Sequence, residues 1–182
     1  MTPPSLGLIM KKYLISIILF FISSSANAVD GYKDLKFGSR IDEIQASNIC
    51  SFEPLTDYGT SVKALECSDF KFGEQNVDAA ALFINNKFLR FVIDVDVEYS
   101  EAIARQLTAK YGAPSSQSPQ SDFDGVDRHP NRTAFVAFDS NTVYLEVDSD
   151  DNNTQSLMLI YTSPVYDRLL LKNQHQEISN DL

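Results

Sequence analysis

Hydrophobic and polar residues alternate near the middle of the chain. Apolar side chains occupy every second position from Leu89 to Val97, with Arg90, Asp94 and Asp96 among the polar ones between them. The segments before this run are a mostly apolar stretch at 77–84 and an Asn-Asn turn at 85–86. Because successive strand residues point to opposite sides, the pattern predicts a β-hairpin with one buried face and one solvated face.

The C-terminal half repeats this alternation in three further segments. They are residues 133–138, 142–148 and 156–162, separated by a turn at 139–141 and a polar tip at 149–154. In the second segment Val143, Leu145 and Val147 take the inward phase. Tyr144 and Glu146 are therefore expected to point outward. One more strand, at 62–70, is predicted before the hairpin.

Helical spacing appears in three places, predicted as helices over 39–48, 99–111 and 164–172. In the second, apolar residues recur at steps of four, at Tyr99, Ile103, Leu107 and Tyr111. Gly112 and Pro114 end it. Residues 113–131 are rich in Ser, Gln, Pro and Asp without any period, so we expect a long exposed loop. The tail, 173–182, is expected to be flexible.

The order of these elements is a helix, three strands, a helix and three strands. Meandering strands joined by short turns indicate an antiparallel sheet, and the helices are expected to pack on one of its faces. The sequence therefore predicts a two-layer α+β domain over residues 29–172, in which an αβββ unit is used twice.

The first 28 residues have the features of a cleavable export signal. Lys11 and Lys12 precede an apolar run from Tyr13 to Ile22, and Ala26-Asn27-Ala28 is a small-x-small cleavage site. The apolar run is about half of what spans a bilayer. Translation from Met1 or from Met10 gives the same product. We expect a periplasmic or secreted protein that starts at Val29 and is not inserted in a membrane.

The remaining 154 residues form a strongly acidic chain. Removing the two leader lysines from 15 basic residues leaves 13, against 25 acidic ones, for a net charge of −12. Nucleic acids and anionic lipids are bound through clustered Lys and Arg, which this chain does not contain. This charge argues against both as partners.

The two cysteines, Cys50 and Cys67, are predicted to form a disulfide, because an even number of cysteines in an oxidising compartment favours pairing. A redox pair or a metal site is the alternative. Redox pairs usually have the spacing C-x-x-C, and a metal would need further ligands from His129, His175 or scattered carboxylates.

This arrangement resembles small bacterial envelope proteins of the β-lactamase-inhibitor-protein-like class. The resemblance rests on the segment Lys33-Asp34-Leu35-Lys36-Phe37-Gly38 leading into a capped helix, and on a cysteine pair between a helix and a strand. The small lipoprotein of the outer-membrane assembly machine shares this plan, but the present chain has no lipid-attachment cysteine. The resemblance implies non-catalytic protein binding through an exposed sheet face and loops.

Candidate chemical sites in the sequence are weak. The run 148–153 is similar to the start of a calcium loop, but Asn153 and Leu159 replace the expected glycine and acidic residue. Neither histidine lies on a predicted helix or strand, and no serine lies in a G-x-S-x-G motif. Paired carboxylates such as Asp94 and Asp96 share one solvated strand face. We therefore predict no catalytic residue, no cofactor and no metal.

Two functional classes remain open. The first is an exported module that binds another envelope protein as an inhibitor, immunity factor or accessory subunit, and the residues favour this class. The second is an enzyme or small-ligand binder whose site is assembled from dispersed residues. For the first class, Tyr144, Arg90 and Asp94 are the candidate binding face, because their phases place them together opposite the helices.

Overall fold

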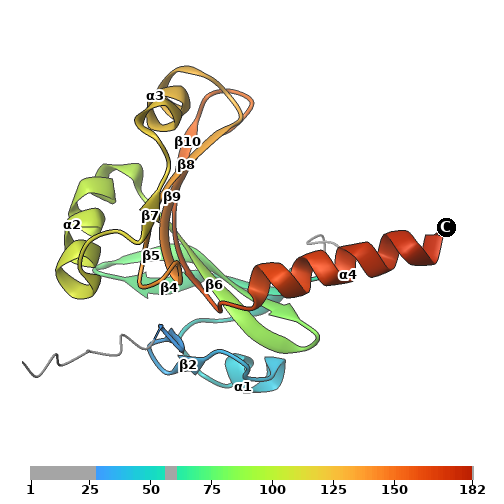
Figure 1. Ribbon diagram of the computed structural model, residues 1–182. Helices are drawn as coiled ribbons and strands as arrows, with labels where there is room; N and C mark the ends of the chain where they lie inside the picture. Colours follow the sequence, from blue (N-terminus) through green and yellow to red (C-terminus); the bar gives the residue numbers. More distant parts are fainter. Residues whose placement is uncertain (1–27, 56–60, 182) are drawn as a thin grey trace, which may run out of the picture.

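The structure is a computed structural model that describes residues 28–55 and 61–181. Its main feature is an antiparallel sheet with the strand order β3-β4-β5-β6-β10-β9-β8-β7. These strands are β3 (Glu53–Leu55), β4 (Lys63–Phe72), β5 (Gln75–Ile84), β6 (Lys87–Val95), β7 (Ser116–Gln117), β8 (Arg132–Phe138), β9 (Val143–Ser149) and β10 (Gln155–Thr162). Figure 1 shows these strands with the helices α1 (Ile41–Gln45), α2 (Ser100–Tyr111), α3 (Gln120–Arg128) and α4 (Tyr166–Asp181). A separate two-stranded sheet is formed by β1 (Gly31–Tyr32) and β2 (Leu35–Lys36). A 3₁₀ turn, η1 (Val97–Tyr99), precedes α2.

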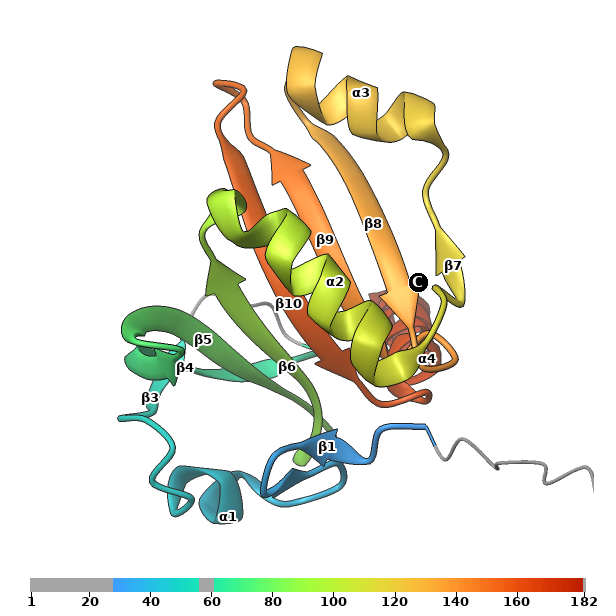
Figure 2. The ribbon, with the colours of Figure 1, turned by 90° about the vertical axis from the view of Figure 1, so that its left-hand side faces the viewer.

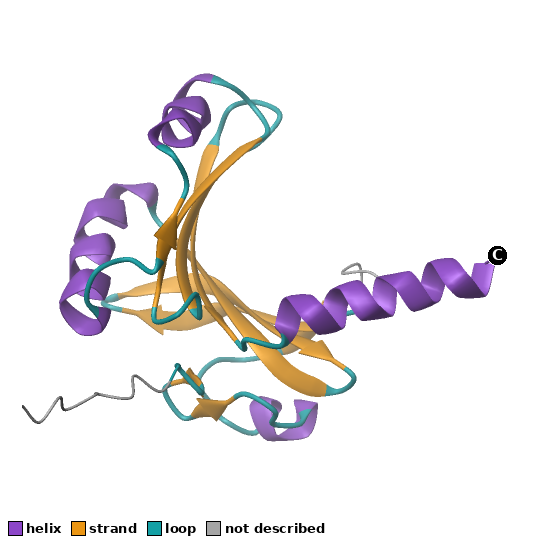
Figure 3. Cartoon of the chain, viewed as in Figure 1, coloured by secondary structure: helices purple, strands orange, loops and turns teal. Residues whose placement is uncertain are grey.

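Two three-stranded meanders meet in the centre of the sheet, and β3 and β7 flank them at its edges. The first is β4-β5-β6, the second is β8-β9-β10, and β6 pairs with β10 from Leu157 opposite Val95 to Thr162 opposite Arg90. The turn between β5 and β6 is formed by Asn85 and Asn86, with φ of 53° and 59°, as the tightest hairpins require. The α+β class with an antiparallel sheet is confirmed. A helix precedes each meander, but β3 follows α1, and β7 and α3 follow α2, before the meander begins. Figure 3 shows the sheet bending between its two halves.

The larger core lies on one side of this sheet. Inward residues of β5, β6 and β10, such as Ala81, Phe91 and Leu159, pack against Ile103 and Leu107 of α2. The β1-β2 segment covers the same side, where the Tyr32 ring lies 5.1 Å from the ring of Phe91. Figure 2 looks onto this side, with α2 lying across the strands.

The helix α4 packs on the other side, so the prediction that all helices share one face is wrong. Tyr166, Leu169 and Leu170 of α4 join a second core with Leu82 and Leu89. Figure 1 shows α2 and α4 on opposite sides of the sheet. The side-chain alternation that buries Ala81 and Phe83 on one side exposes an equally apolar pair, Leu82 and Ile84, on the other, and α4 covers that pair.

The predicted end of the last helix and the predicted long loop also differ from the structure. Helix α4 ends at Asp181 instead of Lys172, so residues 173–181 are helical. Residues 113–131 contain β7 and α3, where only a loop was expected. Among its described residues, helix α3 fully buries Val126, and Phe123 lies one helical step before it. Two apolar positions are too few to reveal a helical period in the sequence.

The predicted disulfide is present. Cys50 and Cys67 are bonded, and they join the segment after α1 to β4 across 17 positions of sequence. The predicted leader lies almost entirely outside the described residues. In the ranges that the structure does describe, no helix combines the length and the apolar character needed to cross a membrane.

Candidate binding face

The side of the main sheet that points away from α2 is here called the open face. Its residues alternate with those of the larger core and are matched across neighbouring strands by the register of the sheet. They are Glu66, Asp78, Ala80, Val92, Asp94, Thr133, Phe135, Ala137, Tyr144, Glu146, Asp148, Ser156, Met158 and Ile160. Among the described helices, α4 packs on this side. It covers the end near Leu82 and Leu89, and Ala80 and Val92 lie at the margin of that contact.

An apolar row crosses the middle of the open face. It runs over five strands as directly opposed neighbours: Ala80, Val92, Ile160, Tyr144 and Ala137. Tyr144 and Val92 are only half-buried, which leaves part of each side chain in contact with solvent. The Tyr144 ring contacts Phe135, at a ring distance of 5.7 Å. The centre of this face is therefore more apolar than a solvated sheet surface requires.

A second row, beside the first, alternates acidic and apolar side chains. Its opposed neighbours are Asp94, Met158, Glu146 and Phe135. Glu146 is half-buried between Met158 and Phe135. Asp148, two positions further along β9, accepts a hydrogen bond from the hydroxyl of Thr133.

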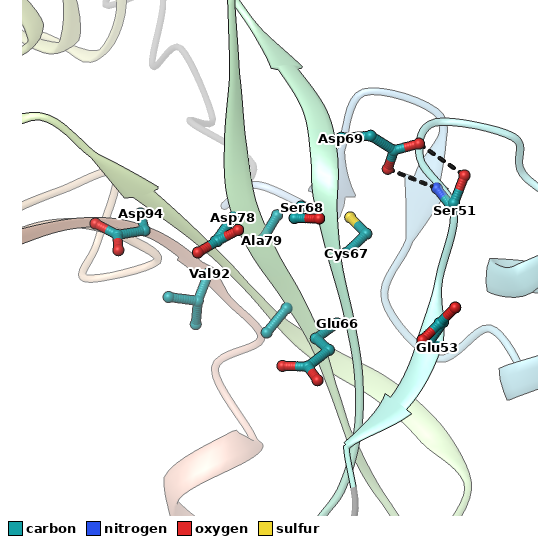
Figure 4. Close-up of a pocket in the computed structure, with 11 residues that line it drawn as sticks. Ser51, Glu53, Glu66, Cys67, Ser68, Asp69, Asp78, Ala79, Val92 and Asp94 are labelled. Atoms are coloured by element: carbon teal, nitrogen blue, oxygen red, sulfur yellow. Dashed lines mark hydrogen bonds between the residues drawn. The ribbon is translucent and has the colours of Figure 1, made fainter.

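The acidic residues continue into a groove at the β3-β4 edge of the sheet. The groove has a volume of about 560 Å³, and five carboxylates line it: Glu53, Glu66, Asp69, Asp78 and Asp94. Figure 4 shows Asp78 and Asp94 on neighbouring strands, with Val92 and Ala79 beside them. Asp69 is held by Ser51, whose amide and hydroxyl donate at 2.8 and 2.7 Å.

Burial and like charges raise the pKa of two carboxyls on the open face. Desolvation is the larger cause for Asp94, and the nearby charge of Asp78 adds to it. Glu146 has its pKa raised by burial and by Asp148, while Arg90 acts in the opposite direction. By contrast, the two hydrogen bonds from Ser51 lower the pKa of Asp69. The open face therefore holds negative charge where the fold itself disfavours it.

The three residues singled out from the sequence lie on one side of the sheet, but Arg90 is already engaged. Its guanidinium donates to Asp167 at 2.8 Å and to the Thr162 hydroxyl at 3.1 Å. It also stacks over the ring of Tyr166, 3.7 Å from the centroid. Arg90 thus fastens the start of α4 to the sheet. Tyr144 and Asp94 remain accessible, and their role in binding stays a prediction.

The other candidate chemical groups form no reactive cluster in the described ranges. Cys50, Cys67 and Asp69 lie close enough to share a metal, but both sulfurs are committed to the disulfide. The calcium-like run 148–153 begins in the last residues of β9 and continues into a turn. In this turn Oδ1 of Asp150 accepts hydrogen bonds from the amides of Asn152 and Thr154. The two histidines are exposed and belong to different elements, His129 at the end of α3 and His175 in α4.

Sequence reasoning missed several members of the open face. Met158, Ile160 and Phe135 belong to it, although the sequence shows them only as parts of apolar runs. The phase of each strand was available from the alternation. The missing information was the order of strands, because the pairing of β6 with β10 brings Asp94 and Glu146 to either side of Met158. No local pattern specifies a pairing between segments that lie about 65 residues apart.

Comparisons with known proteins place the chain in a family without indicating its activity. The model of a family described as "Uncharacterised protein" matches residues 32–181. The chain belongs to this family. A relative from Haemophilus influenzae, described as "Uncharacterized protein", is 30% identical over 175 residues, covering 95% of this chain and 99% of the relative. No solved structure matches the chain. The likeness to the β-lactamase-inhibitor-protein-like class is therefore limited to the antiparallel α+β arrangement.

Proposed function

We propose that this protein is an exported, non-catalytic module that binds another protein of the cell envelope through the open face. The observation that carries the proposal is the apolar row that crosses five strands of the open face. Ile160 and Ala137 are buried within this row, whereas Ala80, Val92 and Tyr144 stay partly exposed and can contact a partner. The part of a sheet side that no helix covers normally meets water and is polar. An apolar centre with a polar surround is the usual composition of a protein interface.

The energetics of association favour this face over the rest of the surface. A few aromatic and apolar anchors supply most of the binding energy at an interface, and charged groups supply orientation and rate. Tyr144 and Phe135 are in mutual contact, so their rings lose little further conformational freedom when a partner covers them. The alternative role of Tyr144, as a good strand former on a solvated sheet, does not account for its apolar neighbours on both sides, Ile160 and Ala137.

The cellular location is part of the proposal and rests on the sequence. The charged, apolar and small-residue segments before Val29 are those of an export signal. The disulfide between Cys50 and Cys67 is compatible with an oxidising compartment. The topological resemblance to the β-lactamase-inhibitor-protein-like class adds support, since that class implies protein binding through a sheet face. The partner is then an envelope protein that the exported domain meets in the periplasm.

Photocrosslinking in intact cells tests the proposal. A photoreactive amino acid replaces Met158 in the centre of the open face, and the control carries it at Ala109, exposed on α2. We expect a discrete protein adduct from the Met158 position and none from the Ala109 position. Equal adducts at both positions, or none at Met158, would contradict the proposed face.

A matched pair of truncations provides the second test. Tyr144→Ala removes the aromatic anchor of the open face, while Tyr99→Ala removes a 43% exposed tyrosine near α2. Tyr144→Ala is expected to reduce the Met158 adduct at least several-fold, and Tyr99→Ala to leave it unchanged. Both variants should keep a thermal midpoint within a few degrees of the wild type, because neither side chain is fully buried.

A second candidate function, small-ligand binding, is favoured by a groove on the α2 side. The groove lies between α2 and α3, has a volume of about 380 Å³, and is largely apolar, with Phe123, Val136 and Val147 among its walls. Volumes of this size accommodate small ligands. Ala104→Phe would fill the groove. A small-molecule extract of the periplasm is added to the protein, and the thermal midpoint is measured. A rise in the midpoint of the wild type that is absent from Ala104→Phe, together with no adduct from the Met158 position, would favour this candidate.

A further inference from the structure

Negative charges on the open face are placed next to one another, where they repel. Asp78 raises the pKa of Asp94 across neighbouring strands, and Asp148 raises the pKa of Glu146 along β9. Like charges placed side by side on a sheet are destabilising. Single substitutions to Asn or Gln would remove this repulsion, so a surface shaped for stability alone would not keep both pairs.

Solubility also gives no reason for these positions. Carboxylates that serve solubility extend freely into water, as those of Asp34 and Glu74 do in their exposed turns. Glu146 is instead half-buried between Met158 and Phe135. Asp94 is exposed, but it stands beside Met158 and Val92, and partial desolvation raises its pKa. The negative charges of Asp94 and Glu146 thus alternate with the apolar side chains of the second row, directly beside the apolar row.

The basic side chain beside these rows, Arg90, is occupied elsewhere. It lies on β6 two positions before Val92, and its guanidinium donates to Asp167 of α4 and stacks on Tyr166. Its effect on the pKa of Glu146 is smaller than those of burial and of Asp148. Within the described part of the chain, Arg90 therefore leaves the charge of the open face unbalanced.

We infer that the partner meets the open face with a basic segment, in which lysine or arginine side chains flank an aliphatic or aromatic anchor. This inference rests on the proposed function and adds the chemistry of the partner. The anchor covers the row from Val92 to Tyr144, and the basic groups approach Asp94 and Glu146. Binding then relieves the repulsion within both carboxylate pairs, so part of the electrostatic cost of the free protein is recovered in the complex.

The register sets the spacing that the partner must match. Asp94 and Glu146 lie on strands separated by one strand, β10, and so stand about 10 Å apart. The apolar row lies two residues along the strands, at roughly 7 Å from the acidic row. A partner segment with two basic groups about 10 Å apart and an apolar group between them on one side fits both rows.

Binding of short peptides to the mature protein tests the inference. The probe is a fluorescent fourteen-residue helical peptide with lysines seven positions apart, about 10 Å along the helix, and leucines between them on the same side. Its comparison is the same peptide with glutamate in place of lysine. The face variant is Asp94→Asn with Glu146→Gln. The control variant, Glu74→Gln with Asp122→Asn, removes the same charge from exposed positions outside the open face.

We expect the lysine peptide to bind the wild type and the glutamate peptide to bind no more than weakly. The face variant should lose about tenfold in affinity for the lysine peptide, and the control variant less than about twofold. Equal losses in the two variants would show attraction to bulk negative charge only and would overturn the inference, as would absence of binding to the lysine peptide. The thermal midpoint of both variants is also measured, so that a loss of binding is not mistaken for a loss of folding.

The photocrosslinked adduct separates this inference from the proposed function. If the Met158 position gives an adduct, mass spectrometry identifies the partner segment that it contacts. A segment rich in lysine and arginine supports the inference, while a neutral or acidic segment overturns it and leaves the proposed function intact. Absence of a specific adduct at Met158 would instead contradict the proposed function itself.

Discussion

Opening the Cys50–Cys67 disulfide should destabilise the domain by about 3 kcal/mol. The two cysteines are 17 positions apart, and closing a loop of that length lowers the entropy of the unfolded chain by about 10.5 cal/mol/K, or about 3 kcal/mol at 25 °C. This is a large share of the roughly 5–15 kcal/mol by which a domain of this kind is stable. The disulfide also ties the segment that carries β1, β2 and α1 to β4.

Urea unfolding of the oxidised and the reduced protein measures this difference directly. Reduction keeps both side chains, so the change in the free energy of unfolding reports the crosslink. The double variant Cys50→Ser with Cys67→Ala is expected to lose somewhat more, because Cys67 is only 6% exposed and its side chain packs in the larger core. A difference below about 1 kcal/mol between the oxidised and reduced forms would refute the chain-entropy reasoning. Two free thiols in the unreduced protein would contradict the pairing itself.

Four further predictions concern the N-terminus, the open face, α4 and the polar tip. Mass spectrometry of the exported product should find Val29 as its first residue. Because the pKa of Glu146 is raised in the folded state, stability falls as the pH rises above the usual carboxyl range. Glu146→Gln should therefore raise the free energy of unfolding at neutral pH and lose this advantage in acid, below about pH 4, where Glu146 is protonated in both states. Arg90→Gln should speed amide exchange throughout α4 while the sheet stays protected, since it removes both the ion pair and the stacking on Tyr166. Millimolar calcium should leave the thermal midpoint unchanged, and a rise of several degrees would show a site in the tip 148–153.

The local elements of this protein were readable from its sequence. Alternation located the strands of both meanders to within about two residues, and the four-residue steps from Tyr99 to Tyr111 located α2. Asn85-Asn86 was read as a turn because these residues accept positive φ at little cost. In each case the information lies in neighbouring residues, because backbone preference and the phase of burial act over a few positions.

Elements with few buried apolar residues could not be read in this way. Helix α3 packs through two apolar residues, Phe123 and the fully buried Val126. Helix α4 continues to Asp181 although only its first turns join the core around Leu82. These helices are thus fixed by a few contacts with distant strands, which no local period reveals. The side of the sheet on which α4 packs was likewise decided by Leu82 and Ile84. These residues lie in an unbroken apolar run, so the side that they face is known only once Ala81 and Phe83 are seen to face α2.

The open face belongs wholly to the tertiary structure. The sequence by itself determined that Tyr144 and Glu146 point away from the core of their strand, and that Arg90 and Asp94 do so on theirs. Only the pairing of β6 with β10 and of β10 with β9 set Asp94, Met158 and Glu146 side by side. Only the docking of α4 decided that Arg90 holds Asp167 instead of these carboxylates. Strand phase is a property of each residue and its neighbours, whereas strand order depends on the free energy of the whole sheet.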